Sequence, residues 1–207
     1  MWTTKERCTA VRTALAFSLA LAAAVPLSAD EAGVKGGATR STFFPSGAGW
    51  DAGTGFQAGA FYERPLTSRV SVRPELFVAR RVTTSESVGP DIAFGSALRL
   101  DYLEMPVVLV RSFGTSDRLR PELFAGAYVA TRLSARLSTE AAGHALDEDF
   151  AAEVERHDAG FVAGGALRLR RWLAELRYTA GLRRADTGWL EERAKNRSFA
   201  VLAGLRF

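Results

Sequence analysis

Residues 172–183, WLAELRYTAGLR, alternate between apolar and polar side chains with a period of two. Leu176 and Tyr178 fall on one face of an extended chain, and Glu175 and Arg177 fall on the other. This period is typical of a β-strand, because successive side chains of a strand point to opposite faces. The charges sit on one face only, so that face lies either in water or inside a polar lumen.

The same alternation recurs along the chain, and its longest runs exceed the five or six residues typical of soluble strands. At roughly 3.3 Å per residue, residues 119–137 reach across a bilayer even when tilted. Pro106 cannot donate a ladder hydrogen bond, so we expect a bulge or the end of regular pairing near Glu104. The predicted strands span residues 33–44, 55–64, 70–82, 91–111, 119–137, 161–170, 172–183 and 199–207.

The links between these strands alternate in length. Short links are expected at residues 65–69, 112–118 and around Arg171, and long ones at 45–54, 83–90, 138–159 and 185–197. Outer-membrane barrels have short periplasmic turns and long external loops. The sequence therefore predicts an all-β fold, a single antiparallel up-and-down transmembrane β-barrel of about eight strands, with both termini periplasmic.

The first 29 residues predict a cleaved signal peptide, which leaves residues 30–207 for the barrel. Lys5, Arg7 and Arg12 precede an apolar run that ends in a small-residue cleavage site at Ala29. Cys8, the one cysteine, lies in this segment, so the mature chain is expected to have no disulfide and no thiol nucleophile. The net charge of +4 falls to about +2 without the peptide, which gives no support for binding to nucleic acid.

Three short segments resemble the outer-membrane β-barrel domain family of small porin-like, PorT-like barrels. They are DYLEMP at residues 101–106, ELRY followed by GL within residues 175–182, and GLRF at residues 204–207. The resemblance implies a barrel in the outer membrane but no single activity. It also implies that Phe207, the aromatic residue that ends the last strand, is the signal by which the barrel-assembly machinery recognises the chain.

Charged residues of both signs fall on the polar faces, and the segment RPELF occurs twice, at residues 73–77 and 120–124. We interpret the repeat as two similar strands that solve the same packing problem. The lumen of an eight-stranded barrel is just wide enough for side chains to fill, so the charges are expected to pair across it. The predicted lumen charge network comprises Arg73, Glu75, Arg99, Asp101, Arg120, Glu122, Arg168, Glu175 and Arg177.

Basic residues also gather near the predicted outer ends of strands. The guanidinium group of arginine matches phosphate oxygens, so these positions suggest a rim that contacts outer-membrane lipids and lipopolysaccharide phosphates. Nothing in the sequence identifies a protein partner. The rim residues are Arg136, Arg184, Arg193, Lys195 and Arg197.

The sequence offers no arrangement that favours catalysis or a cofactor. His144 and His157 both fall in the longest predicted loop, with no serine within the next two positions. The acidic run 147–149 lacks the glycine turn of a calcium loop, so we expect a solvated or briefly helical segment rather than a metal site. We therefore expect no enzyme but a structural or interaction barrel, with a small channel or transport-linked barrel as the alternative. A lipid-modifying enzyme and a soluble periplasmic ligand-binding barrel are less favoured.

Overall fold

The computed structural model describes residues 30–44, 51–88, 93–114, 119–141, 144–152, 154–183 and 195–207. The predicted signal peptide, residues 1–29, lies outside these described ranges. Within them, no helix is long and apolar enough to cross a membrane.

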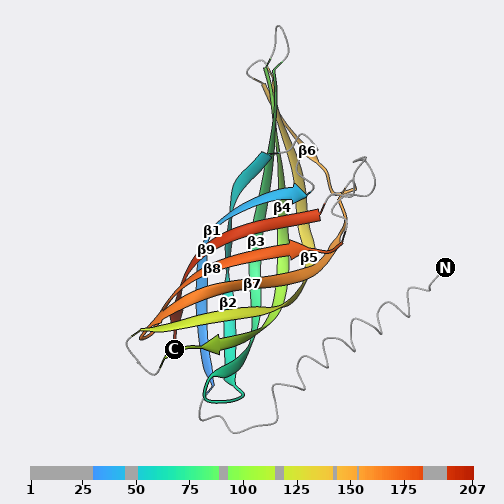
Figure 1. Cartoon of the computed structure of the whole chain (residues 1–207). Coiled ribbons are helices and arrows are strands. Elements are labelled where there is room, and N and C mark those ends of the chain that lie inside the picture. Colours follow the sequence, from blue (N-terminus) through green and yellow to red (C-terminus); the bar gives the residue numbers. More distant parts are fainter. Residues whose placement is uncertain are drawn as a thin grey trace, which may run out of the picture. The chain divides into compact units, whose positions relative to one another are not determined.

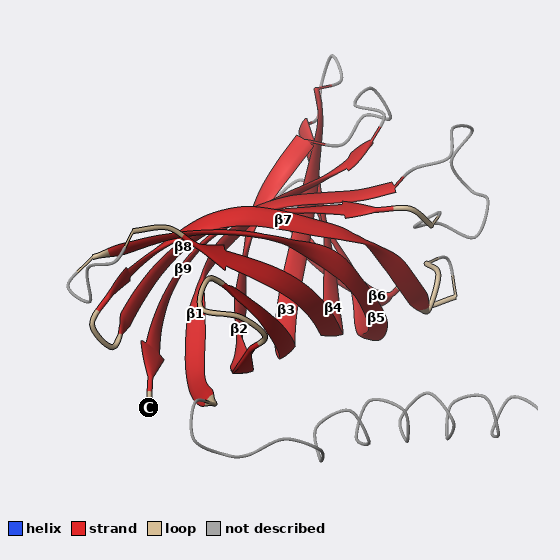
Figure 2. Ribbon diagram, turned by 60° about the horizontal axis from the view of Figure 1, so that its bottom comes forward, coloured by secondary structure: helices blue, strands red, loops and turns tan. Residues whose placement is uncertain are grey.

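Nine antiparallel strands form the structure, and eight of them close into a barrel (Figures 1 and 2). The first strand pairs with the last, and the remaining barrel strands pair in chain order. The ninth strand, β6, is not part of the closed barrel, and in the described sheet it pairs with β5 alone. The strands are β1 (Glu31–Phe44), β2 (Asp51–Pro65), β3 (Val70–Val88), β4 (Ala93–Ser112), β5 (Arg120–Ala141), β6 (His144–Asp149), β7 (His157–Leu169), β8 (Trp172–Gly181) and β9 (Lys195–Arg206). The predicted all-β barrel of about eight strands is confirmed.

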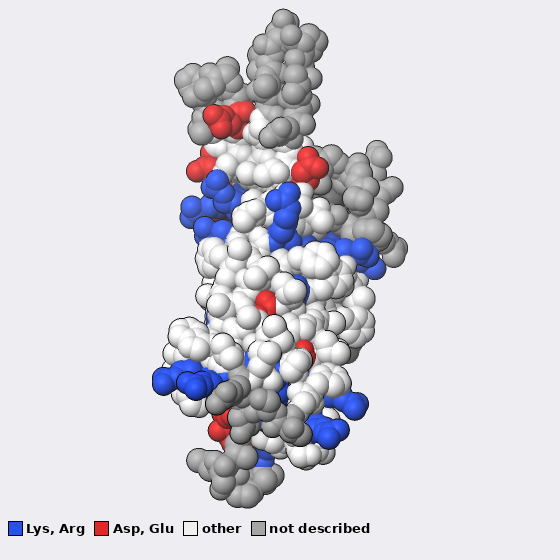
Figure 3. Space-filling view, turned by 60° about the vertical axis from the view of Figure 1, so that its left-hand side comes forward, with Lys and Arg blue, Asp and Glu red and all other residues white. Residues whose placement is uncertain are grey.

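Side chains alternate between a lipid-facing surface and the lumen, as the strand period requires. In β8, Leu176 points outward with 65% of its surface exposed, whereas its neighbours Glu175 and Arg177 are buried inside. Figure 3 shows the result on one face of the molecule, a mostly uncharged belt between two levels of basic side chains. A soluble fold buries its apolar face, so this exposed apolar belt marks a membrane barrel.

The tight hairpin expected around Arg171 is present between β7 and β8. Leu169 and Trp172 pair across it, and Arg170 adopts a positive φ of 54° in the two-residue turn. Hairpin turns of this length need positive φ because their twist must match that of the flanking strands.

All four long links predicted from the sequence are partly strand, since β2 already begins at Asp51 and β9 at Lys195. β3 continues to Val88 instead of ending near residue 82, and the predicted loop 138–159 contains the end of β5, all of β6 and the start of β7. The acidic run 147–149 is therefore neither loop nor helix but part of β6.

The strand segments beyond the predicted loop boundaries have a small apolar core of their own, which stabilises them. Leu98, Leu100 and Tyr102 of β4 are buried together with Val154, which lies between β6 and β7. The amide of Phe150 also donates to the carbonyl of Ala135, at 3.1 Å.

The bulge expected near Pro106 is not present, but regular pairing is interrupted there on one side, because Met105 and Pro106 have no partner in the ladder with β3. Glu104, Met105 and Pro106 pair in unbroken register with β5, and β3 keeps the same register on both sides of the proline. The register shift lies instead in β5, opposite the step from Asp101 to Tyr102. A bulge in β5 adds one residue there, which reverses the faces of the residues that follow it.

Candidate functional site

The centre of the lumen holds a lysine that contributes to two ion pairs. Lys35 of β1 places its Nζ 2.7 Å from Oε1 of Glu75 and 2.6 Å from Oε2 of Glu175, and all three side chains are completely buried. Its ammonium group also lies 5.4 to 6.0 Å from the centres of three aromatic rings, close enough for cation–π attraction. These rings belong to Phe61, Phe77 and Phe124.

The same two carboxylates also bind an arginine. Arg177 donates from Nε to Oε1 of Glu175 at 2.8 Å and from Nη2 to Oε2 of Glu75. Lys35 and Arg177 therefore share Glu75 and Glu175, and two cations face two anions across the lumen. Such mutual pairing offsets part of the free energy that burying each charge costs.

Arg73 connects this group to a second layer of charge. Its Nη2 lies 2.6 Å from Oε2 of Glu63 and 2.8 Å from Oε2 of Glu122, and its side chain is fully buried. Arg168 reaches Oε1 of Glu122 at 2.7 Å, and Arg206 lies 3.6 Å from Glu63.

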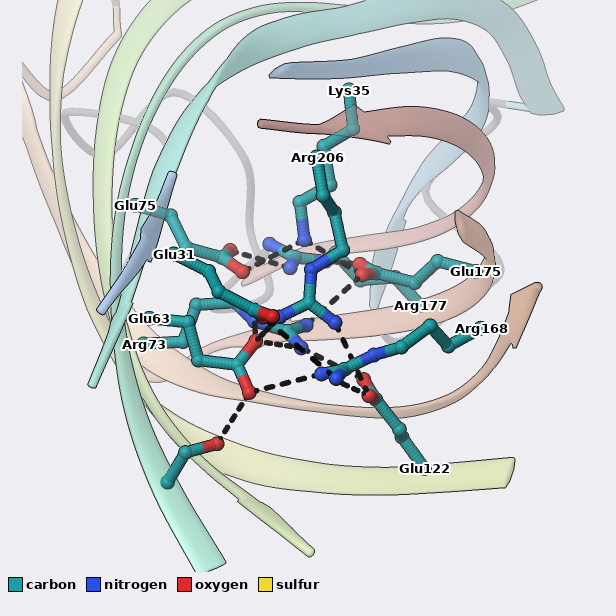
Figure 4. Close-up of polar contacts among 11 residues, drawn as sticks. Glu31, Lys35, Glu63, Arg73, Glu75, Glu122, Arg168, Glu175, Arg177 and Arg206 are labelled. Carbon is teal, nitrogen blue, oxygen red and sulfur yellow. Dashed lines mark hydrogen bonds and ion pairs between the residues drawn. The ribbon is translucent and has the colours of Figure 1, made fainter. Parts of the chain in front are cut away.

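Figure 4 shows these side chains pointing toward one another from opposite walls of the barrel. Seven of the eight barrel strands contribute, and only β4 does not. We call the group the lumen network, and it comprises Glu31, Lys35, Glu63, Arg73, Glu75, Glu122, Arg168, Glu175, Arg177 and Arg206.

Small residues make room for the rings that surround the lysine. A Cβ atom at Gly164 would lie 2.5 Å from Cζ of Phe124, and one at Gly33 would lie 2.5 Å from Cζ of Phe61. Contacts that short do not occur between real atoms, so the rings could not keep these positions beside alanine.

A second buried group, the upper cluster, lies toward the loop end of the lumen. Arg81 pairs with Glu104 at 2.6 Å and with Asp158 at 3.1 Å. Oδ2 of Asp158 also accepts hydrogen bonds from the Tyr128 hydroxyl at 2.9 Å and from Asn196 at 3.1 Å.

The structure places most of the predicted lumen residues inside. Arg120 begins β5 on the same inward-facing register as Glu122. Arg99 and Asp101 were predicted wrongly, because Arg99 is exposed and Asp101 is half-buried on the outer face. At this height β4 has passed the apolar belt, so the outer face is polar and the inner face carries Leu98 and Leu100 instead.

Sequence reasoning missed lumen residues on several strands. Lys35 lies in the glycine-rich strand predicted at residues 33–44, where Glu31, Lys35 and Thr39 nevertheless alternate with Ala32 and Val34 and carry the signal. Glu104 and Asp158 were overlooked because a slip was expected beside the first and a loop at the second.

Only part of the predicted basic rim can be placed. Arg136 is exposed on the outer face of β5, and Lys195 and Arg197 are half-buried at outward positions of β9. Arg184 and Arg193 lie outside the described residues.

In the part of the chain that the structure describes, few side chains are arranged in a way that could support catalysis. His157 is exposed at the start of β7, and its Nδ1 lies 3.3 Å from the Thr131 hydroxyl. No carboxylate among the described residues has a hydrogen bond to this imidazole, so the pair lacks the third group that orients a catalytic base. These residues also contain no group of three or more histidine, cysteine or acidic side chains placed to bind a metal.

Comparison with known proteins places the chain among outer-membrane barrels. The model of the family described as "Outer membrane protein beta-barrel domain" matches residues 28–186. No curated protein matches the sequence.

Several solved structures are similar in fold at low sequence identity. Ail, the attachment invasion locus protein of Yersinia pestis, solved in complex with the heparin analogue sucrose octasulfate, is 15% identical, with 86% of this chain and 99% of that chain covered and a TM-score of 0.43. Neisserial surface protein A is 12% identical, with coverage of 87% and 98% and a TM-score of 0.46. OprG from Pseudomonas aeruginosa is 14% identical, with coverage of 86% and 96% and a TM-score of 0.47.

Proposed function

The chain belongs to the outer membrane protein β-barrel domain family and is a protein of the cell outer membrane, and we propose that it acts there as a structural or interaction protein with a side-chain-filled, non-conducting lumen. The observation that carries this proposal is the burial of the lumen network. The side chains of Lys35, Arg73, Glu75, Glu122 and Glu175 have no exposed surface.

Ion conduction needs a continuous path of water or of weakly held polar groups. Here Lys35 and Arg177 are each bound to two carboxylates at hydrogen-bond distance. A passing ion would have to break pairs whose separated charges are costly to bury. The network therefore supports a lumen that is blocked to ions, rather than the small channel that the sequence leaves as the alternative.

An interaction role is supported by the strands that continue past the apolar belt. The ends of β4 and β5, with β6 paired to β5, form a projection in which Leu98 and Leu100 of β4 pack with Ala135 of β5. Leu146 of β6 is 66% exposed, and the neighbouring residues 147–149 are acidic and exposed. Such a projection offers a fixed surface to a partner, whereas a barrel with bare loops would not.

Single-channel recording in planar bilayers tests the proposal. The wild-type barrel should give no defined conductance steps, whereas the double variant R73A/R177A, which removes two large side chains from the network, should give them. R111A is the matched control, because Arg111 is exposed on the outer face of β4 and away from the lumen. Regular conductance steps in the wild type, equal to those of the double variant, would instead establish the channel function.

A further inference from the structure

The outer face of β3, β4 and β5 carries a group of charged side chains at the height where the apolar belt ends. Arg80 donates from Nε and Nη2 to the two carboxylate oxygens of Asp101, at 2.7 and 3.0 Å. Ser134 donates to the same carboxylate at 2.9 Å, and the Arg80 guanidinium lies 5.4 Å from the ring centre of Phe56. Arg80 is thus neutralised and held in place by its neighbours.

Two further arginines of this group have no such partner. Arg99 and Arg136 are register partners on adjacent strands, and both are exposed on the outer face. Among the described residues neither makes a hydrogen bond or a close ion pair, although Arg136 attracts the Asp101 carboxylate at longer range. Like charges directly opposite each other on a sheet are destabilising. On its other side Arg136 lies opposite Asp149 of β6, whose carboxylate accepts a hydrogen bond from the amide of Ala151. An anion bound between Arg99 and Arg136 would remove the repulsion that remains between the two guanidinium groups.

The position of the pair along the strand indicates the source of the anion. On the outer face of β4, the exposed residues Met105, Val107 and Leu109 separate Asp101 from Arg111. The ten-residue step between those charges is roughly 33 Å of strand. At the usual barrel tilt this corresponds to about 25 Å of height, the thickness of the apolar band of outer-membrane barrels.

Arg99 therefore lies at the boundary between the membrane core and its headgroups. Because short turns are periplasmic in this architecture and Arg99 lies toward the opposite, loop end of β4, the headgroups beside it belong to the outer leaflet.

We propose that Arg99 and Arg136 bind a phosphate monoester on the headgroup of an outer-leaflet lipid, and that Arg80 and Asp101 hold the surrounding surface in shape. A phosphate monoester carries a charge of about −1.5 to −2 at neutral pH, which two arginines balance. The planar guanidinium groups donate in pairs to phosphate oxygens, and lysine could not do this. The site is independent of whether the lumen conducts.

The test uses the folded full barrel in detergent micelles, with bisphosphorylated lipid A as the probe and native mass spectrometry as the readout. Dephosphorylated lipid A and inorganic phosphate are the comparison ligands. The variant R99Q/R136Q should bind bisphosphorylated lipid A at least about tenfold more weakly than the wild type, because two charge-assisted contacts are lost. R111Q, which removes an exposed arginine at the other edge of the belt, should bind like the wild type.

Heat-modifiable gel migration verifies that each variant is folded. Equal binding of lipid A by the wild type and R99Q/R136Q would overturn the proposal, and so would equal binding of the phosphorylated and dephosphorylated lipids. Inorganic phosphate that competes as well as lipid A would mean a site for free anions and would overturn the lipid assignment.

Discussion

Arg73 and Glu122 project into the lumen from β3 and β5, the two strands that pair with β4, and form a buried ion pair with Nη2 and Oε2 2.8 Å apart. They are the first residue of one RPELF segment and the third residue of the other. In both segments the arginine, glutamate and phenylalanine face inward, and Phe77 and Phe124 both flank Lys35. The repeat therefore supplies two walls of one charge network, as expected of two strands with the same packing task.

Replacement of Glu122 by alanine should lower the free energy of unfolding by about 3 to 5 kcal/mol, because Arg73 and Arg168 would each lose a buried partner. Urea titration of the barrel in lipid vesicles, followed by tryptophan fluorescence, measures the change. E140A is the matched control, since Glu140 is an exposed carboxylate of the same strand and its loss should change stability little. Equal midpoints for the two variants would contradict the network.

Adjacent residues of β8 test the assignment of the two faces. Leu176 faces lipid and Glu175 faces the lumen, so L176R should cost roughly 2 to 4 kcal/mol if the residue lies near the bilayer midplane. L176F should be tolerated because the lipid-facing surface accepts an aromatic ring. The same urea titration distinguishes them, and a stable L176R barrel would show that this face is not in lipid.

The strand period was enough to predict the barrel wherever membrane and lumen impose opposite polarities. That rule holds at Glu175 and Leu176, and at Glu122 and Leu123. It fails at Arg99, because the strand has left the membrane there and the polar face turns outward. The charges do change phase in the sequence, from the odd positions of Arg99 and Asp101 to the even position of Glu104. Within one strand, however, a bulge and a membrane boundary produce the same change of phase, so the sequence alone does not distinguish them.

The ion pairs within the network could not be predicted from the pattern of any single strand. Lys35 meets Glu175 from a position 140 residues away, and that meeting depends on how the first and last strands close the barrel. The bulge in β5 depends on how β4 and β5 pair, so the sequence of neither strand alone predicts it. Composition could predict that buried charges pair, but only the register shows which ones do.

Phe207 is predicted to act as the assembly signal. It follows β9 with 76% of its surface exposed, and its amide donates to the carbonyl of Ala32. F207A should reduce the folded outer-membrane population several-fold, measured by heat-modifiable migration of the membrane fraction. Arg206 is unsuitable as a control because it belongs to the lumen network.

F199A provides the matched comparison, since Phe199 is an aromatic residue on the same outer face of β9 with 65% of its surface exposed. If lost apolar contact alone explained the defect, F199A and F207A would assemble equally poorly. A much larger loss for F207A supports recognition of the terminal residue.

The direction of insertion follows from the lengths of the connections, since the short turn between β2 and β3 should face the periplasm and β6 should lie outside the cell. Cysteine at Glu148, which is exposed in β6, should react with a membrane-impermeant maleimide on intact cells. Cysteine at Ser68, exposed in the short turn, should react only after the outer membrane is permeabilised. Cys8 is the only native cysteine and lies in the predicted signal peptide, so each label reports one position. Reaction of S68C on intact cells, with E148C protected, would mean that the barrel is inserted the other way and that Arg99 and Arg136 face the inner leaflet.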